Sequence, residues 1–413
     1  MAAPTLHNFE LTAALAELTD WLIQQGLENT PVQDWLNTCC NRLVAAGIPL
    51  QRVNLSTRAH HPEIGAVAFR WFRDAESESF EYRRRGEEEV VEEYLQSPLY
   101  YLMSNDDAEL RQRLDVPNPQ HDFPIFDELR ATGTTDYFAT KRFFLKSDQL
   151  SAPNPESGGE GMMISLTTDA PGGFTEAWLD GLRGLIAPIS LTLKSAANRR
   201  MAEDITATYL GADASRRVLS GDIMRGSSDV ISAVIWYFDL KGFTTLSETL
   251  PGEQIISLLN DYFGLAVEVV EQHDGNVLKF MGDGMLAIFD LSAHPDARLK
   301  AIEAACALRD AFAAMNEARR ADDLPITGFT LGLHAGDVLY GNIGGKTRLD
   351  FTVIGPAVNT TARILGMSGP VGQNIVISAR VAEPLKDSRP DLVSLGAYRL
   401  RGVSARQELF TLD

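Results

Sequence analysis

The chain has 413 residues, more than a single hydrophobic core usually serves, so two domains are expected. Its formal net charge of −19 at pH 7 repels phosphate, which argues against a general binder of nucleic acid or of anionic membranes. Three cysteines form neither a disulfide framework nor a metal-binding spacing, so a cytoplasmic compartment is expected. No apolar run approaches the roughly 20 residues of a transmembrane helix, and the N-terminus lacks the basic region of a signal peptide.

The first part of the chain, residues 1–195, predicts a mixed α+β domain. Apolar residues at helical spacing predict helices over 11–25 and 31–46. Alternating apolar residues predict strands over 50–57, 65–74, 136–145 and 161–168, and the charged stretch 83–95 predicts a solvated helix. By fold-level analogy we expect a GAF-like or PAS-like sensor, which regulates the following domain through an unknown ligand or protein. Alternatively, this domain only dimerises.

A long helical pattern follows from Pro171 to about residue 210, with an interruption expected near Pro188. It leads into a linker region, residues 196–225. A helix in this place is expected either to pair with a second copy and transmit a signal or to pack as a linker.

From residue 226 to the end the pattern changes. Strands are expected over 233–240, 277–281, 285–289, 328–341 and 350–355, and helices over 252–273, 297–318 and 357–365. Strands and helices alternate without all strands needing to be parallel, which predicts an α/β sandwich.

Two aspartates stand at the ends of apolar strands in this second domain. Asp239 ends the strand of "AVIWYFDL", and Asp283 occupies the Gly-Asp-Gly turn of "NVLKFMGDGMLAIFD". The two could converge on Mg²⁺, which proteins usually hold with one or two carboxylates plus substrate phosphates. Alternatively, Asp239 caps the next helix and Asp283 only makes the turn. Lys279, inside the same hairpin, would then snorkel or lie on an edge.

The stretch "DFTVIGPAVNTTARIL" predicts a strand followed by a helix that begins near Pro356. Asn359 and Arg363 are four residues apart and therefore share one helix face, where they could hold a sugar and a phosphate. The alternative is that Arg363 pairs with a surface acid. The nearby "YGNIGGKTR" contains Gly-Lys-Thr, but Tyr340 stands where a P-loop needs glycine, so a Gly-rich hairpin turn is expected instead.

These stretches, in this order, strongly resemble the catalytic domain of class III nucleotide cyclases. "YFDLKGFT" and "LKFMGDGMLAIF" resemble the two metal motifs of the family, "FTVIGPAVNTTARI" its transition-state segment and "YRLRGV" its phosphate-contact segment. "HAGDVLYGNIG" resembles its hairpin region, and "ATYLGADASRRVLSGDIMRG" its lead-in. The resemblance covers about half of the chain and implies a ferredoxin-like α+β sandwich over residues 226–413.

The resemblance also implies a role for each matching position. Asp239 and Asp283 would hold two Mg²⁺ or Mn²⁺ ions per active site. Lys279 and Thr352 would recognise the purine. By the same resemblance Asn359 would orient the ribose, Arg363 would stabilise charge at the α-phosphate and Arg401 would bind the terminal phosphates. The family works as a head-to-tail dimer, so a homodimer with ATP at the interface is implied, and the expected activity is adenylate cyclase.

The choice of ATP depends on two residues. Lysine can donate to adenine N1 and a threonine hydroxyl can accept from its amine, whereas guanylate-forming relatives typically carry glutamate and cysteine there. The commonest adenylate-forming pattern has aspartate in place of Thr352, so discrimination against GTP is expected to be weaker. The alternatives are a guanylate cyclase and a degenerate nucleotide-binding regulator, although a degenerate module should lack at least one catalytic residue.

Overall fold

The computed structural model describes residues 4–58, 64–83, 92–117, 120–144, 161–403 and 405–413. The chain divides into two compact units, residues 1–205 and residues 206–413, which are described separately below. Of the expected helix over 83–95, only α3 (Glu92–Leu95) lies in the described part of the chain. Among the described residues, no helix combines the length and the apolar character needed to cross a membrane.

The N-terminal unit is built on a six-stranded antiparallel sheet with the strand order β3-β2-β1-β6-β5-β4. Its strands are β1 (Leu50–Arg58), β2 (Ile64–Phe72), β3 (Glu78–Arg83), β4 (Glu109–Arg113), β5 (Asp136–Phe143) and β6 (Gly161–Thr168). Its helices are α1 (Pro4–Glu28), α2 (Val32–Ala45), α3, α4 (Pro98–Ser104), α5 (Pro124–Ala131) and α6 (Glu176–Leu210). The predicted α+β class is confirmed, while the GAF-like or PAS-like assignment stays a prediction.

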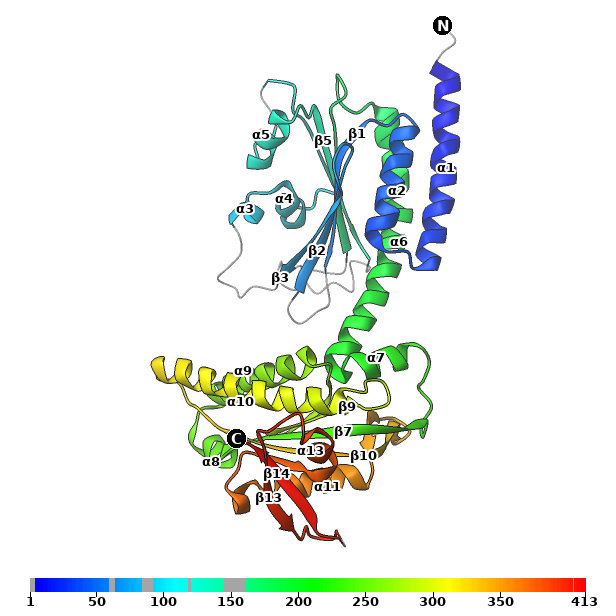
Figure 1. Cartoon of the computed structure of the whole chain (residues 1–413). Coiled ribbons are helices and arrows are strands. Elements are labelled where there is room, and N and C mark those ends of the chain that lie inside the picture. Colours follow the sequence, from blue (N-terminus) through cyan, green and yellow to red (C-terminus); the bar gives the residue numbers. More distant parts are fainter. Residues whose placement is uncertain (1–3, 59–63, 84–91, 118–119, 145–160, 404) are drawn as a thin grey trace. The chain divides into compact units, whose positions relative to one another are not determined.

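Helices cover both faces of this sheet, as Figure 1 shows. Helices α1, α2 and α6 lie on one face, where Leu22, Trp35 and Leu185 belong to one buried cluster. Helices α3, α4 and α5 lie on the other face, over a smaller cluster that contains Phe126 and Tyr137.

The interruption expected near Pro188 is wrong, because α6 continues as a helix through this residue. A proline inside a helix removes one hydrogen bond and strains the preceding turn, which costs about 3 kcal/mol. Leu185, Ile189 and Leu193 are buried against the sheet on both sides of the proline. Burying each such side chain contributes about 1.5–3 kcal/mol, so the packing offsets the cost of the proline. Up to Leu193 the helix is therefore packed, and self-pairing of its remaining part stays a prediction.

The C-terminal unit contains an eight-stranded mixed sheet with the order β13-β14-β12-β10-β7-β9-β8, and β11 pairs with β10 off this path. Its strands are β7 (Ser228–Leu240), β8 (Asn276–Met281), β9 (Gly284–Asp290), β10 (Phe329–Gly344), β11 (Leu349–Ile354), β12 (Ile375–Ser378), β13 (Leu392–Tyr398) and β14 (Gln407–Leu412). The pair β10 and β12 is parallel, whereas the other pairs are antiparallel. The expected α/β architecture is confirmed.

The helices of this unit cover two faces of the sheet. They are α7 (Ala212–Leu219), α8 (Phe243–Thr249), α9 (Gly252–Gln272), α10 (Ala297–Ala321), α11 (Pro356–Leu365), α12 (Ser368–Val371), α13 (Ala379–Ala382) and the 3-10 helix η2 (Glu383–Leu385). Helices α9 and α10 lie together on one face, where Trp236 and Phe238 of β7 are fully buried (Figure 1). On the other face Ile235 of β7 packs with Phe351 of β11 and Ala357 of α11. Strand β11 and helix α11, which carry Thr352, Asn359 and Arg363, therefore lie over the face opposite to α9 and α10.

Candidate active site

Asp239 and Asp283 are brought together by the pairing of β7 with the β8-β9 hairpin. Asp239 lies opposite Gly284 in the antiparallel pair of β7 and β9. The hairpin turns over two residues between Met281 and Gly284, and Gly282 has φ +65°, a conformation that favours glycine. The main-chain N–H of Leu240 donates to the carbonyl oxygen of Asp283 over 3.0 Å. The turn that carries Asp283 is thus held beside the end of the strand that carries Asp239.

The electrostatics of this pair indicate two close carboxylates without a cation. Burial, and after it the negative charge of Asp283, raises the pKa of Asp239 from its ordinary value of 3.8 to about 6. Burial and the same two carboxylates also raise the pKa of the Tyr237 hydroxyl. Within the described part of the chain, no lysine or arginine pairs with either aspartate. Such a pair favours a bound cation, because the cation relieves the repulsion.

The space beside the aspartates also suits a metal ion. A Cβ atom at Gly284 would lie 3.1 Å from Oδ1 of Asp239 and 3.0 Å from the carbonyl oxygen of Phe238, so the glycine keeps this space open. The described residues contain no group of three or more His, Cys, Asp or Glu side chains that could hold a metal. Two carboxylates are nevertheless enough for Mg²⁺, which takes its remaining ligands from water and substrate phosphates. The residues present therefore fit a magnesium or manganese site.

Lys279 lies in β8, the edge strand of the sheet, and its ammonium group pairs with a carboxylate of β11. Its Nζ atom lies 2.5 Å from Oδ2 of Asp350, and the Lys279 side chain is 29% exposed. Asp350 and Thr352 are two residues apart in β11 and therefore point to the same side of the strand. The Thr352 hydroxyl is buried and has no hydrogen-bond partner among the residues that the structure describes. A buried hydroxyl without a partner is unfavourable, so it is available to a ligand that can pair with it.

Asn359 and Arg363 line one depression on α11. Its volume is about 510 Å³, and its walls also include Gly355, Thr360 and Gly402. Gly355 and Pro356 begin the helix, so Asn359 lies in its first turn. No carboxylate of the described chain pairs with Arg363. The alternative of a surface ion pair is thereby excluded for these residues, and the guanidinium is free to bind an anion.

Arg401 lies in the exposed turn that borders this depression. The turn is closed by the N–H of Val403, which donates to the carbonyl oxygen of Leu400 over 3.1 Å. Gly402 has φ +71°, which favours glycine in this turn, and a Cβ atom there would lie in ordinary contact, 3.4 Å from Nη2 of Arg363. Neither Asp239 nor Asp283 lines the depression.

The structure also decides two alternative interpretations. Asp239 does not cap the next helix: α8 begins after Gly242, and no side chain caps it. The segment with Gly-Lys-Thr joins β10 to β11 in an antiparallel hairpin, closed by the Gly345 N–H, which donates to the Arg348 carbonyl oxygen over 2.8 Å. The expected hairpin is therefore confirmed, and the P-loop interpretation is excluded.

Two residues of this region were not singled out in the sequence. Asp350 alternates with Thr352 in the strand "LDFTVI", so it shares a face with Thr352. Gly284 follows the turn without a positive φ, which indicates a role in close approach rather than in turn conformation. Both signals are visible in the sequence only once the strand and the turn are assigned.

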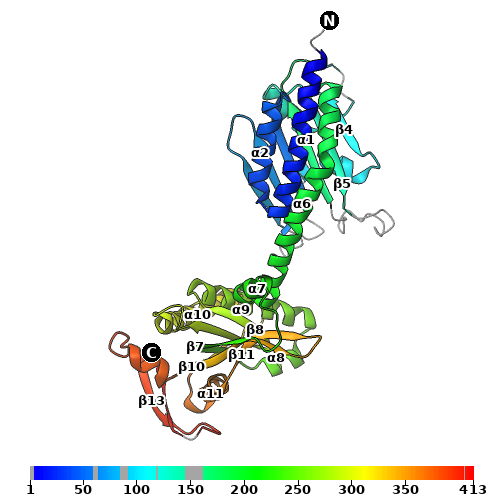
Figure 2. The same ribbon diagram turned by 90° about the vertical axis from the view of Figure 1, so that its right-hand side faces the viewer.

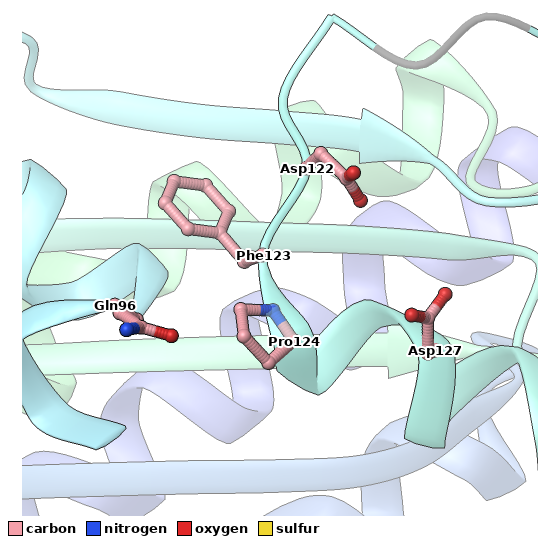
Figure 3. Close-up of a pocket in the computed structure, with 5 residues that line it drawn as sticks. All are labelled: Gln96, Asp122, Phe123, Pro124 and Asp127. Atoms are coloured by element: carbon pink, nitrogen blue, oxygen red, sulfur yellow. The ribbon is translucent and has the colours of Figure 1, made fainter. Parts of the chain in front are cut away.

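A second depression lies in the N-terminal unit. Figure 3 shows its lining residues, which come from the segment before α4 and from the start of α5: Gln96, Asp122, Phe123, Pro124 and Asp127. Its volume is about 510 Å³, and Asp127 is paired with Arg130.

Residues 227–413 match the family described as Adenylate and Guanylate cyclase catalytic domain. "Adenylate cyclase 1" of Rhizobium meliloti (strain 1021) is 32% identical over 234 residues, which are 54% of this chain and 34% of that protein. "Adenylate cyclase" of Anabaena cylindrica is 32% identical over 174 residues, 41% of this chain and 34% of that protein. The alignments thus span about a third of the length of each relative.

Solved structures of cyclases are also similar to this chain. The adenylyl cyclase CyaB from P. aeruginosa aligns with a TM-score of 0.42 and 24% identity, over 45% of this chain and 96% of that one. The guanylyl cyclase Cya2 aligns with a TM-score of 0.40 and 29% identity, over 45% of this chain and 93% of that one.

Proposed function

Because residues 227–413 belong to the family of adenylate and guanylate cyclase catalytic domains, we propose that this chain is an adenylate cyclase. It converts ATP into 3′,5′-cyclic AMP and diphosphate, and the N-terminal unit regulates it. The similar proteins of Rhizobium meliloti and Anabaena cylindrica are named adenylate cyclases, which supports ATP as the substrate.

The observation that carries the proposal is the pair Asp239 and Asp283, with which no lysine or arginine of the described residues forms an ion pair. Burial and the neighbouring charge raise the pKa of Asp239 to about 6, and Gly284 leaves room beside its carboxylate. We propose that the two aspartates hold two Mg²⁺ or Mn²⁺ ions. When bound, these ions neutralise phosphate charge and make the attacking ribose hydroxyl more acidic.

The remaining residues of the site align the substrate. Attack of the ribose 3′-oxygen on the α-phosphorus needs orientation and charge stabilisation more than covalent help from side chains. Asn359 holds the ribose so that its 3′-oxygen faces the α-phosphate. Arg363, which pairs with no acidic side chain of the described residues, donates hydrogen bonds to the α-phosphate oxygens as their charge increases. Arg401 binds the terminal phosphates and thus the leaving diphosphate.

Lys279 and Thr352 select the purine in this proposal. The Lys279 ammonium donates to adenine N1, and its ion pair with Asp350 holds it beside β11. The buried Thr352 hydroxyl, which bonds no other group in the described part of the chain, accepts from the adenine amine.

We further propose that two copies of the chain share each site. The two aspartates do not line the depression that contains Asn359 and Arg363. A second chain can therefore supply Asp239 and Asp283, here called the metal half of the site. Val230, Leu339 and Ile354 lie opposite one another on β7, β10 and β11, and each is between 41% and 71% exposed. A row of exposed apolar side chains on neighbouring strands fits an interface with a second copy.

The substrate assignment is tested by measuring kcat/KM for ATP and GTP in the wild type and in Thr352→Asp. A hydroxyl can donate to the guanine O6 atom as well as accept from adenine, whereas a carboxylate only accepts. The wild type should prefer ATP, and Thr352→Asp should raise the ATP-to-GTP ratio by about tenfold, the effect of one hydrogen bond.

Thr352→Val is the matched control, because it keeps the shape of the side chain and removes the hydroxyl. It should lower kcat/KM for ATP more than for GTP. A wild type that prefers GTP would overturn the assignment of the substrate.

A further inference from the structure

The short helix α7 contacts the strands that carry the proposed purine-binding residues. Figure 2 shows α7 beside β8. The chain enters α7 through Gly211, which has φ +84°, and a Cβ atom there would lie 2.8 Å from the carbonyl oxygen of Val277 in β8. Val277 is two residues before Lys279. A larger residue at position 211 would therefore be strained and would press on β8.

A buried tyrosine links α7 to both β8 and β10. Tyr340 of β10 is 2% exposed, and its hydroxyl donates to Oδ2 of Asp213 in α7 over 2.9 Å. The side-chain amide of Asn276 in β8 donates to the same hydroxyl over 3.2 Å. Burial, and after it the charge of Asp213, raises the pKa of Tyr340, so the hydroxyl stays protonated and acts as a donor. One hydroxyl group thus joins three elements.

Arg217 of α7 extends this contact to β11. Its guanidinium lies 5.1 Å from the ring centre of Tyr340 and 6.0 Å from that of Phe351. The two rings meet edge to face at 4.8 Å. Arg217 is itself held by Asp213 at 3.2 Å and by Asp229 of β7 at 2.8 Å. Cation–π contacts of a half-buried arginine stabilise such an arrangement.

The contacted residues are neighbours of the purine-binding residues in sequence. Asn276 is three residues before Lys279, and the pairing of β8 with β9 is irregular between Val277 and Lys279. Such an irregularity redirects the side chain that follows it. In β11, Phe351 lies between Asp350 and Thr352. A shift of β8 or β11 relative to α7 would therefore move the Lys279 ammonium away from Thr352.

We propose that Asp213, Arg217, Asn276, Tyr340 and Phe351, together called the α7 brace, are positioning residues for purine recognition. The α7 brace holds β8 and β11 at the separation at which Lys279 and Thr352 contact one base. This inference rests on the proposed function, and it assigns to α7 a role in selectivity between ATP and GTP.

The test is Tyr340→Phe in the full-length chain, which removes the two hydrogen bonds and keeps the ring. KM for ATP should rise about tenfold, and kcat should change by less than about twofold, because the metal and phosphate contacts are untouched. The ATP-to-GTP ratio of kcat/KM should fall as well.

Tyr262→Phe is the matched control. Tyr262 is also fully buried in the C-terminal unit, and its hydroxyl bonds Asn316 and accepts from the Thr327 N–H at 3.3 Å, but it lies in the α9 and α10 core. It should lose thermal stability and keep the wild-type KM and selectivity. Equal KM and equal selectivity in Tyr340→Phe and Tyr262→Phe would overturn the inference, because Tyr340 would then only stabilise the fold.

Asp213→Asn serves if Tyr340→Phe does not fold, since it keeps the side-chain shape and removes the charged acceptor. Asp213→Asn should also raise KM for ATP, as Tyr340→Phe does. An unchanged KM would again contradict the role proposed for the α7 brace. A wild type that forms no cyclic nucleotide from either substrate would contradict the proposed function itself. An active wild type, together with a Tyr340→Phe variant that keeps the wild-type KM and selectivity, would contradict only this inference.

Discussion

Replacing Asp239 with asparagine is expected to abolish turnover and, in metal-free protein, to stabilise the fold. Burial and the charge of Asp283 raise the pKa of Asp239 to about 6, so its ionised form is disfavoured in the folded state. An amide has no charge to bury and is a poor ligand for Mg²⁺. The same substitution therefore removes a charge that burial and repulsion disfavour, and it also removes the proposed metal site.

The stability gain should depend on pH in a defined direction. The folded-state pKa lies above the ordinary value of 3.8, so the ionised carboxylate lowers stability progressively as pH rises from about 4 to about 6. The difference in free energy of unfolding between Asp239→Asn and the wild type should be small at pH 4 and about 1 kcal/mol above pH 6, because solvent screens the half-exposed carboxylate. Denaturant unfolding of the full chain with a chelator, at pH 4 and pH 7.5, measures this difference.

Metal addition separates the two effects of the substitution. Mg²⁺ binds only the folded state, so it should raise the unfolding temperature of the wild type and not that of Asp239→Asn. Asp337→Asn, at an exposed position of β10, is the control and should respond to Mg²⁺ as the wild type does. Near-normal turnover in Asp239→Asn would contradict the metal assignment.

Replacing Arg363 with alanine should lower kcat on the order of 10³-fold while changing KM for ATP by less than about threefold. An arginine that stabilises charge only as it develops contributes to the transition state and little to substrate binding. Arg363 lines the depression with Asn359 and has no acidic partner in the described chain, so its loss leaves no unpaired carboxylate behind. Steady-state rates of cyclic AMP formation over a range of ATP concentrations give both constants.

Two further variants sharpen the Arg363 test. Arg363→Lys keeps the charge and loses the planar pair of donors, so it should recover only part of the lost rate. Arg320→Ala, at an exposed position near the end of α10, should behave as the wild type. A large rise in KM with an unchanged kcat would show that Arg363 binds the ground state and would contradict its assigned role.

The parts of the site that could be predicted are those determined by local sequence. The turn at Asp283 follows from two glycines between apolar runs, and the placement of Asn359 and Arg363 on one face follows from their spacing. The ion pair of Lys279 with Asp350 could not be predicted, because it depends on how β11 packs over β8, far away in sequence. The same holds for Tyr340, whose partners lie on α7 and β8.

The fold was predicted least well where elements are short or where packing outweighs local preference. Strands β3 and β4 and helices α4 and α5 have five to eight residues each, too few for a periodic apolar pattern. The continuity of α6 through Pro188 depends on tertiary burial of its neighbours, which the local sequence does not display.

We propose that each site combines the metal half of one chain, which carries Asp239 and Asp283, with the purine half of another, which carries Lys279 and Thr352. Mixing Lys279→Ala with Asp283→Ala tests it most directly, since each variant alone should be nearly inactive. Their heterodimer has one intact site, so random mixing should recover about a quarter of the wild-type rate. The control mixture of Asp239→Ala with Asp283→Ala damages the metal half of both chains and should stay inactive. No recovery in the first mixture, with heterodimers shown to form, or equal recovery in both mixtures would contradict the shared site.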